Sequence, residues 1–346
     1  YEPMDAGQIM YYREDQKGQI LEEGITEAGS MSAWIAAATS YANHHLPLIP
    51  FYVYYSMFGY QRVGDLVWAA GDLQARGFMV GGTAGRTTIN GEGLQHQDGH
   101  SHILMSTVPT CRAYDPCYGH ELAVIMQDGL KRMFQDKENC FYYLTVMNEN
   151  YSHPQMPEGS EEGIVRGMYL LKSGENAAKK KAPRVQLMGS GTILREVEAA
   201  AELLAEDHGV VADVWSVTSF NELRREALEY DRQQFLDYDE KREKPWVVQQ
   251  LDGVEGPVIA STDYMKLYAD QIRAWVPTDF HVLGTDGFGR SDTREQLRRF
   301  FEVDRYYVTI QALRALAKRG EIDVKVVNDA MKKYGIDPAK PSPLLS

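Results

Sequence analysis

The chain has 346 residues, of which 44% are hydrophobic and 25% charged, the balance of a globular protein long enough for two ordinary domains. Its 36 basic and 49 acidic residues leave a net charge of −13, which argues against a nucleic-acid partner because a phosphate backbone would be repelled. The apolar runs are too short to span a bilayer, and the three cysteines fit no disulfide framework, so we expect no membrane segment and a reducing, cytoplasmic compartment.

Helix and strand patterns alternate along the first half of the chain. LPLIPFYVYYS (46–56) is β-branched and aromatic, which is typical of a buried strand, and FMVGGTAG (78–85) predicts a strand that runs into a loop. Helices are also expected within 17–43, at 62–77 and at 120–134. The runs CRAYDPC (111–117) and CFYYLTVMNENY (140–151) lie on either side of the last of these helices.

A change in composition marks the middle of the chain. Residues 152–183 combine turn residues with a lysine run, and IVRGMYLLKSG (164–174) lies between them and resembles a strand. We therefore expect a first α/β domain at 1–160, a linker region at 161–184 and a second α/β domain at 185–346.

The second half repeats the pattern of the first. Residues 185–217 predict a strand, a glycine turn, a long helix and another strand, and a further helix is expected around 263–275. Strands that alternate with helices favour mainly parallel sheets with helices on both faces, so the predicted fold class is α/β, with two α/β/α domains. The chain starts at Tyr1 within sequence that already has this character, and we expect it to be part of a longer polypeptide.

Three histidines crowd into GEGLQHQDGHSH (91–102). His96, His100 and His102 could ligate zinc if the segment were helical, but its three glycines argue against a helix. Two other interpretations stand beside the metal site: a loop whose histidines hydrogen-bond within the protein, and a loop that presents imidazole to an anionic substrate. Because the segment follows the strand at 78–85, it is expected at the sheet edge where open α/β folds bind ligands, which favours a functional role.

Two further features could belong to the same site. Glu27 stands at the head of a largely apolar helical stretch, where it is either solvated or shielded from water. A shielded carboxyl group would have a raised pKa and could donate a proton to a heterocycle. The aromatic residues around the end of the strand at 46–56, among them Tyr55 and Phe58, fit either core packing or a flat pocket for an aromatic ligand.

The segment GTDGFGRSD (284–292) is dense in glycine and charge. We interpret it as an ordered loop in front of a helix, with Ser291 or Asp292 as the N-cap of that helix.

Five segments together carry a resemblance to a known family. EGITEAGSMSAW, FYVYYSMFGYQRVGDL, GEGLQHQDGHSH, ASTDYMK and GTDGFGRSD resemble the homodimeric bacterial pyruvate dehydrogenases, which are transketolase-like thiamine diphosphate enzymes. The resemblance runs from about residue 8 to the end and covers the pyrimidine-binding middle domain and the carboxyl-terminal domain of that family. The family's GDG…N motif, which binds diphosphate and magnesium in an amino-terminal domain, does not occur in this sequence.

The resemblance implies roles for individual residues. Glu27 would hydrogen-bond the pyrimidine ring of the cofactor and activate it, and Phe58 would pack against that ring. Tyr55 and His96 would contact pyruvate, with the imidazole as a hydrogen-bond donor. Glu92 is expected to lie behind these residues, close to the site, and His100 and His102 are expected to orient the loop.

The reaction implied by the resemblance is oxidative decarboxylation of pyruvate with reductive acetylation of the lipoyl group of dihydrolipoyl acetyltransferase. The implied cofactors are thiamine diphosphate and Mg²⁺, with the magnesium ligands in the amino-terminal domain, and the implied assembly is a homodimer. Without that domain, we expect the chain to be inactive by itself. Two alternatives stay open: a transketolase or another thiamine-dependent enzyme, and a zinc hydrolase built on His96, His100 and His102.

Overall fold

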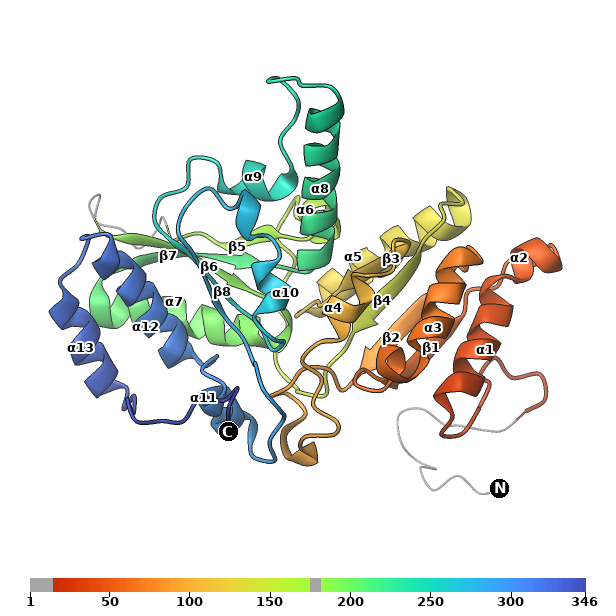
Figure 1. Cartoon of the computed structure of the whole chain (residues 1–346), viewed down its shortest axis with the longest axis horizontal. Coiled ribbons are helices and arrows are strands. Elements are labelled where there is room, and N and C mark those ends of the chain that lie inside the picture. Colours follow the sequence, from red (N-terminus) through yellow and green to blue (C-terminus); the bar gives the residue numbers. More distant parts are fainter. Residues whose placement is uncertain (1–14, 175–181) are drawn as a thin grey trace.

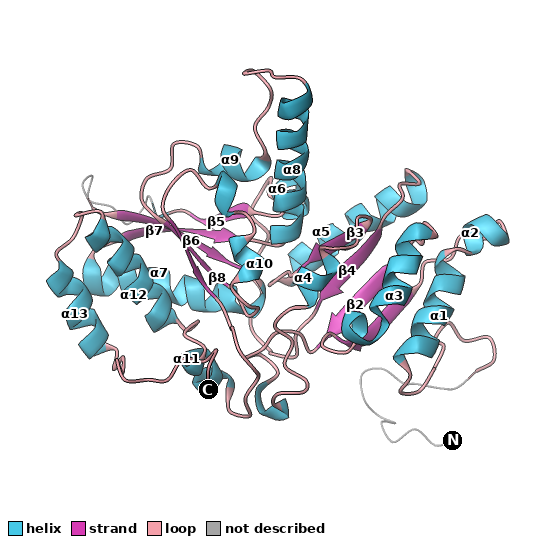
Figure 2. Cartoon of the chain, viewed as in Figure 1, coloured by secondary structure: helices cyan, strands magenta, loops and turns pink. Residues whose placement is uncertain are grey.

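The structure, a computed structural model, describes residues 15–174 and 182–346. These residues form two α/β units that lie side by side, each built around its own sheet (Figure 1, Figure 2). The predicted fold class, two α/β domains with mainly parallel sheets, is confirmed.

The first unit contains a four-stranded parallel sheet with the strand order β1-β2-β4-β3. Its strands are β1 (Phe51–Tyr55), β2 (Phe78–Gly82), β3 (Cys111–Tyr114) and β4 (Phe141–Thr145). Its helical elements are α1 (Glu27–Ala38), α2 (Ser40–Asn43), α3 (Gly59–Asp72), η1 (Asn90–Glu92), α4 (Ser101–Met105), α5 (Gly119–Leu130) with its π-helical continuation η2 (Lys131–Gln135), and α6 (Glu161–Arg166). Neighbouring strands are parallel, so their carboxyl ends, and the loops that follow them, meet at one edge of the sheet.

The second unit contains a five-stranded sheet with the order β5-β7-β6-β8-β9, in which only β5 is antiparallel to its neighbour. Its strands are β5 (Tyr169–Lys172), β6 (Arg184–Gly189), β7 (Val211–Ser216), β8 (Val258–Ser261) and β9 (Phe280–Leu283). Its helical elements are η4 (Gly191–Ile193), α7 (Leu194–His208), α8 (Phe220–Leu236), α9 (Trp246–Leu251), α10 (Leu267–Asp270), η5 (Arg273–Trp275), α11 (Arg294–Phe300), α12 (Arg305–Lys318) and α13 (Val324–Lys333).

Apolar side chains of α1 and α3 cover one face of the first sheet. Met31 and Trp34 on α1, with Val63 and Val67 on α3, belong to one buried cluster that includes Phe141 of β4. Burying a large apolar side chain is worth about 1.5–3 kcal/mol. This core fixes α1 beside α3, and these are the two helices from which the candidate site is partly built.

The strand predicted as buried proves to be only half buried. β1 is an edge strand, and successive side chains of a strand point to opposite faces. Its inner residues pack against α1 and α3, whereas Phe51, Val53 and Tyr55 are 47%, 67% and 46% exposed. The aromatic and β-branched composition predicted a strand, but it did not predict that one face of this strand is exposed to solvent.

Several predicted boundaries also need correction. The helix expected within 17–43 begins only at Glu27, behind the N-cap Thr26. The strand-like run at 164–174 is divided, because α6 continues to Arg166 and ends at Gly167, which has a φ of +112°. The helix expected around 263–275 is two short turns, and α11 is capped by Thr293, whose side chain accepts a hydrogen bond from Gln296 N, instead of by either predicted residue.

In the part of the chain that the structure describes, no helix combines the length and the apolar content that a membrane crossing requires.

Candidate functional site

The candidate site lies at the carboxyl edge of the first sheet. Tyr55 is the last residue of β1, and Phe58 immediately precedes α3. The neighbouring strand β2 leads into the loop that contains His96. Because β1 and β2 are parallel, the connections that follow them meet at this edge, as ligand sites of open α/β sheets do.

The rings of these three residues form one cluster. The centroid of the His96 imidazole lies 5.8 Å from that of Tyr55 and 5.1 Å from that of Phe58, with interplanar angles of 67° and 77°. Tyr55 and Phe58 also meet edge to face, with centroids 6.0 Å apart. Such contacts contribute about 0.5–1.5 kcal/mol each, so together they restrict the orientation of the imidazole.

Glu27 is connected to this cluster through Arg62. Glu27 is the first residue of α1, and its Oε1 lies 2.7 Å from Nη1 of Arg62 on α3. The guanidinium carbon of Arg62 in turn lies 4.2 Å from the centre of the Phe58 ring. The side chain of Glu27 is 19% exposed, so the carboxylate is largely shielded from water and still accessible from one side.

Glu92 lies near His96 without bonding to it. Glu92 Oε2 is 3.9 Å from His96 Nδ1, which is beyond hydrogen-bond distance. His96 Nδ1 is buried, and no hydrogen-bond partner for it exists among the described residues. A buried ring nitrogen without a partner is costly, so this atom is available to a ligand or to water.

The other two histidines of the loop point to different places. His100 precedes α4, and its Nε2 hydrogen-bonds with Oε1 of Gln61; burial lowers the pKa of His100. His102 is fully buried, with Nε2 3.0 Å from Oγ1 of Thr145 and its ring stacked on Tyr268 at 4.9 Å. His100 therefore supports the loop from the α3 side, and His102 belongs to the core.

A zinc site built on the three histidines together is incompatible with this geometry, because the side chains diverge. Within residues 15–174 and 182–346, no group of three or more His, Cys, Asp or Glu side chains is arranged to hold a metal ion.

The residues that do converge suit an aminopyrimidine. The carboxylate of Glu27 can hydrogen-bond a ring nitrogen, and Phe58 offers a flat apolar surface beside it. The unpartnered Nδ1 of His96 supplies a further polar contact at the edge of the same cluster. These groups fit the pyrimidine half of thiamine diphosphate; its diphosphate needs cations and hydrogen-bond donors, and Mg²⁺ needs oxygen ligands.

Sequence reasoning missed Arg62. It stands four residues after Phe58 on the same helical face, and this spacing was a usable signal. Its partner Glu27 is 35 residues away in the sequence, however, and their pairing depends on how α1 packs against α3.

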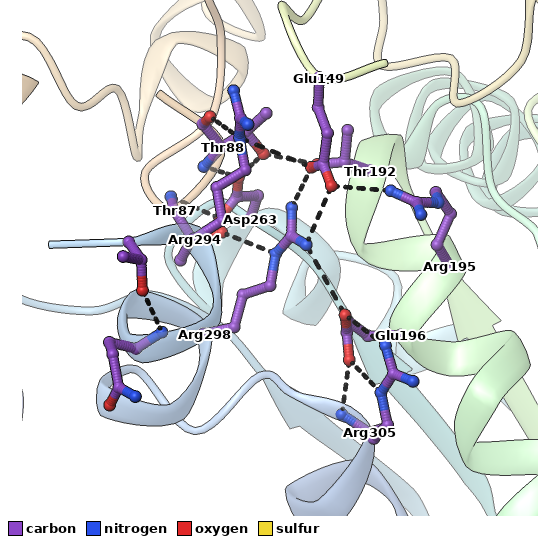
Figure 3. A network of polar contacts seen from close by, with 12 residues as sticks. Thr87, Thr88, Glu149, Thr192, Arg195, Glu196, Asp263, Arg294, Arg298 and Arg305 are labelled. Carbon is purple, nitrogen blue, oxygen red and sulfur yellow. Dashed lines mark hydrogen bonds and ion pairs between the residues drawn. The ribbon is translucent and has the colours of Figure 1, made fainter. Parts of the chain in front are cut away.

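The loop between β2 and η1 is held by the second unit. Asp263, which follows β8, accepts hydrogen bonds of 2.7–3.2 Å from the backbone N–H and hydroxyl groups of Thr87 and Thr88 (Figure 3). Arg298 of α11 pairs with Glu149 and also donates to the Thr87 hydroxyl at 3.4 Å. Burial raises the pKa of Asp263, and the charge of Arg298 acts in the opposite direction. The start of the histidine loop is thus anchored in a buried polar network.

Comparison with known proteins identifies two families along the chain. Residues 1–154 match the pyruvate dehydrogenase E1 component middle domain, and residues 167–304 match the transketolase-like TK C-terminal domain.

Curated relatives match almost the whole chain. The pyruvate dehydrogenase E1 component of Pseudomonas aeruginosa is 63% identical over 345 residues, which cover 99% of this chain and 39% of the relative. The pyruvate dehydrogenase E1 component of Escherichia coli K12 is 58% identical over 348 residues, which cover 100% of this chain and 39% of the relative. The chain therefore spans well under half the length of these relatives.

Solved structures show the same fold at low identity. A transketolase from Leishmania mexicana has a TM-score of 0.61 and 17% identity, and the match covers 85% of this chain and 37% of that one. A split gene transketolase described as an inactive beta4 tetramer has a TM-score of 0.60 and 15% identity, covering 85% of this chain and 83% of that one. These likenesses concern the fold; the family matches and the high identity to the curated relatives show that the chain belongs to the pyruvate dehydrogenase E1 family and corresponds to its middle and carboxyl-terminal, transketolase-like domains.

Proposed function

We propose that this chain forms part of a thiamine-diphosphate-dependent E1 component. The reaction is the oxidative decarboxylation of pyruvate with reductive acetylation of the lipoyl group of dihydrolipoyl acetyltransferase. The names of the relatives, with 63% and 58% identity over nearly the whole chain, support the substrate.

One observation carries the proposal from the structure: four side chains suited to this chemistry form a continuous series of contacts. Glu27 pairs with Arg62, Arg62 lies over Phe58, and Phe58 meets His96. Tyr55 joins both rings from the end of β1. The carboxylate, through Arg62, and the imidazole are thus both connected to the Phe58 ring, which supports the binding of a heterocycle next to a small oxoacid.

Each side chain has a distinct task. When bound, thiamine diphosphate supplies the nucleophilic carbon and accepts the electrons released by decarboxylation. Glu27 exchanges a hydrogen with a ring nitrogen of the pyrimidine, and Phe58 supports that ring. His96 donates a hydrogen bond to the oxygen on which negative charge develops, while Tyr55 lines the same side of the substrate.

The remainder of the proposed enzyme lies outside this chain. Mg²⁺ and the diphosphate are held by an amino-terminal domain, and two copies assemble as a homodimer with the site between subunits. The exposed side chains of β1, Tyr55 among them, support a covered surface here. The proposed compartment is the cytoplasm, where the three cysteines stay reduced.

The test compares substrates on a full-length E1 component that contains this chain. With thiamine diphosphate and Mg²⁺, we expect pyruvate to reduce an artificial electron acceptor, and sugar phosphates to give no transfer of a two-carbon unit. The opposite result would favour the transketolase alternative. The chain by itself, under the same conditions, is expected to turn over neither substrate; pyruvate turnover by the chain alone would contradict the assignment of the diphosphate and Mg²⁺ to another domain.

A further inference from the structure

Gln97, directly after His96, is fully buried although the loop around it is partly exposed. Its Nε2 donates to the carbonyl oxygens of Asn90 at 2.7 Å and of Arg290 at 2.6 Å. Its Oε1 accepts a hydrogen bond from the backbone N–H of Arg290 at 2.7 Å. One amide side chain therefore joins the histidine loop to the segment that precedes α11 in the second unit.

The backbone of the second unit approaches Gln97 so closely that any side chain at Gly289 would force Gln97 to shift. A Cβ at Gly289 would lie 2.6 Å from Oε1 and 2.8 Å from Cβ of Gln97. Beside this contact, the hydroxyl of Ser291 donates to the carbonyl oxygen of Gly91 at 3.1 Å. Residues 289–291 thus lie directly against the loop that carries the imidazole.

His96 and Gln97 cannot move independently, because they belong to one turn. The backbone N–H groups of both residues donate to the carbonyl oxygen of Gly93 at 3.2 Å. Earlier in the same loop, Thr87 and Thr88 hydrogen-bond to Asp263 of the second unit (Figure 3). The chain is consequently attached to the second unit on both sides of His96, at Thr87 and Thr88 before it and at Gln97 after it.

We propose that Gln97 is a positioning residue for His96, and that the second unit sets the place of the imidazole through it. Gln97 itself is fully buried and does not contact the substrate. The inference rests on the proposed function, in which His96 contacts pyruvate. Displacement of a catalytic group by about 1 Å costs up to about 100-fold in rate, so small movements of this turn have large effects.

The test is a double-mutant cycle in a full-length E1 component that contains this chain. Gln97→Met preserves the length of the side chain and removes all three hydrogen bonds. We expect kcat/KM for pyruvate to fall between about 10- and 100-fold, with the Kd for thiamine diphosphate changed less than about threefold. In a His96→Ala background, the same substitution should cause less than about a threefold further loss, because residues that act through one group are not additive.

The matched control is Gln95→Met, two residues earlier on the exposed side of the same loop. It should leave kcat/KM within about twofold. Equal losses from Gln97→Met with and without His96 would show a merely structural role and overturn the inference, as would wild-type activity of the single variant.

A readout without turnover separates this inference from the proposed function. Gln97→Met should increase amide hydrogen exchange in residues 90–98, and Gln95→Met should not. Unchanged exchange contradicts positioning even if pyruvate is the substrate. Failure of the wild type to use pyruvate, or full activity of His96→Ala, contradicts the proposed function instead.

A second variant keeps the test decisive if Gln97→Met does not fold. Gly289→Ala acts from the opposite side of the contact, because the added methyl group displaces the Gln97 side chain. It should reproduce the loss in kcat/KM, again only while His96 is present; an equal loss without His96 would contradict the inference.

Discussion

Glu27 and Arg62 form an ion pair, with Oε1 and Nη1 2.7 Å apart, at the point where α1 meets α3. The pair holds the carboxylate beside the Phe58 ring, because the same guanidinium group lies over that ring. Arg62 is 45% exposed, so the pair adds little to stability, about 0–1 kcal/mol. Its main consequence is the placement of a carboxylate next to an aromatic surface.

Glu27→Gln tests the role of that carboxylate. The amide preserves size but cannot exchange a hydrogen with a pyrimidine nitrogen, so in a full-length E1 component we expect kcat to fall by about 10²–10⁴-fold. The loss of thermodynamic stability should stay near 1 kcal/mol, from the helix N-terminus and the exposed ion pair. Hydrogen exchange at the thiazolium carbon of bound thiamine diphosphate, followed by NMR, should slow in parallel.

The matched control is Glu161→Gln, which also changes a glutamate in the first turn of a helix. It should leave both kcat and the exchange rate within about twofold of wild type. Near-normal activity of Glu27→Gln would remove this residue from the mechanism.

His96→Ala tests the substrate contact. The imidazole forms edge-to-face contacts with Tyr55 and Phe58. In the proposed function, its loss removes one donor to the developing oxyanion. Loss of a single such donor costs about 10²–10³-fold in kcat. We expect this loss in pyruvate-dependent turnover and only a small change in the Kd of thiamine diphosphate, measured by fluorescence titration. An equal loss in pyruvate-dependent kcat and in affinity for thiamine diphosphate would contradict the assigned role.

The exposed face of β1 yields a prediction about assembly. Phe51, Val53 and Tyr55 leave an apolar strip at the sheet edge, and such strips mark interfaces. In a full-length E1 component, Val53→Glu should shift a dimer towards monomer in sedimentation velocity, and activity should fall with the dimer fraction. Phe235→Glu changes a side chain that is 88% exposed on α8 and serves as the control. A Val53→Glu variant that stays dimeric would show that another segment covers this face.

Local patterns placed Tyr55, Phe58 and the loop of His96 at the ends of two predicted strands, but only the family resemblance assigned the three residues to one site. Both connections follow neighbouring parallel strands, and parallel strands bring their carboxyl ends to one edge. The contact between Gln97 and Arg290 was not predictable from local patterns, because it joins a side chain and a backbone segment 193 positions apart through the docking of two units. The exposed face of β1 was missed for a different reason, since strand composition does not tell whether a strand lies at an edge of the sheet.

Buried titratable groups at the junction of the units give a prediction about pH. His102 Nε2 lies 4.0 Å from Asp115 Oδ1, and both atoms bond to Oγ1 of Thr145. Burial lowers the pKa of His102 from 6.5 to about 3 and raises the pKa of Asp115 from 3.8 to about 7. Both groups therefore favour their neutral forms in the folded protein.

The two pKa shifts act on stability in opposite directions. Below pH 6.5 the unfolded chain binds a proton at His102 and the folded protein does not, so stability falls as the pH falls. From pH 3.8 to about 7 the folded protein retains a proton at Asp115 that the unfolded chain has released, so stability falls as the pH rises. Each effect amounts to about 1.4 kcal/mol per pH unit, and between pH 4 and 6.5 they largely cancel.

Single substitutions should separate these contributions. In Asp115→Asn only His102 remains. The free energy of unfolding of this variant minus that of the wild type should therefore decrease by about 1.4 kcal/mol for each unit by which the pH is lowered from 6.5 to 4.5. In His102→Gln the same difference should increase by a similar amount as the pH is lowered over this interval. Urea denaturation at three pH values measures these slopes, and His44→Gln, an exposed histidine, should leave the wild-type slope unchanged. Parallel pH profiles for all four proteins would mean that neither buried group holds its neutral form in the folded state.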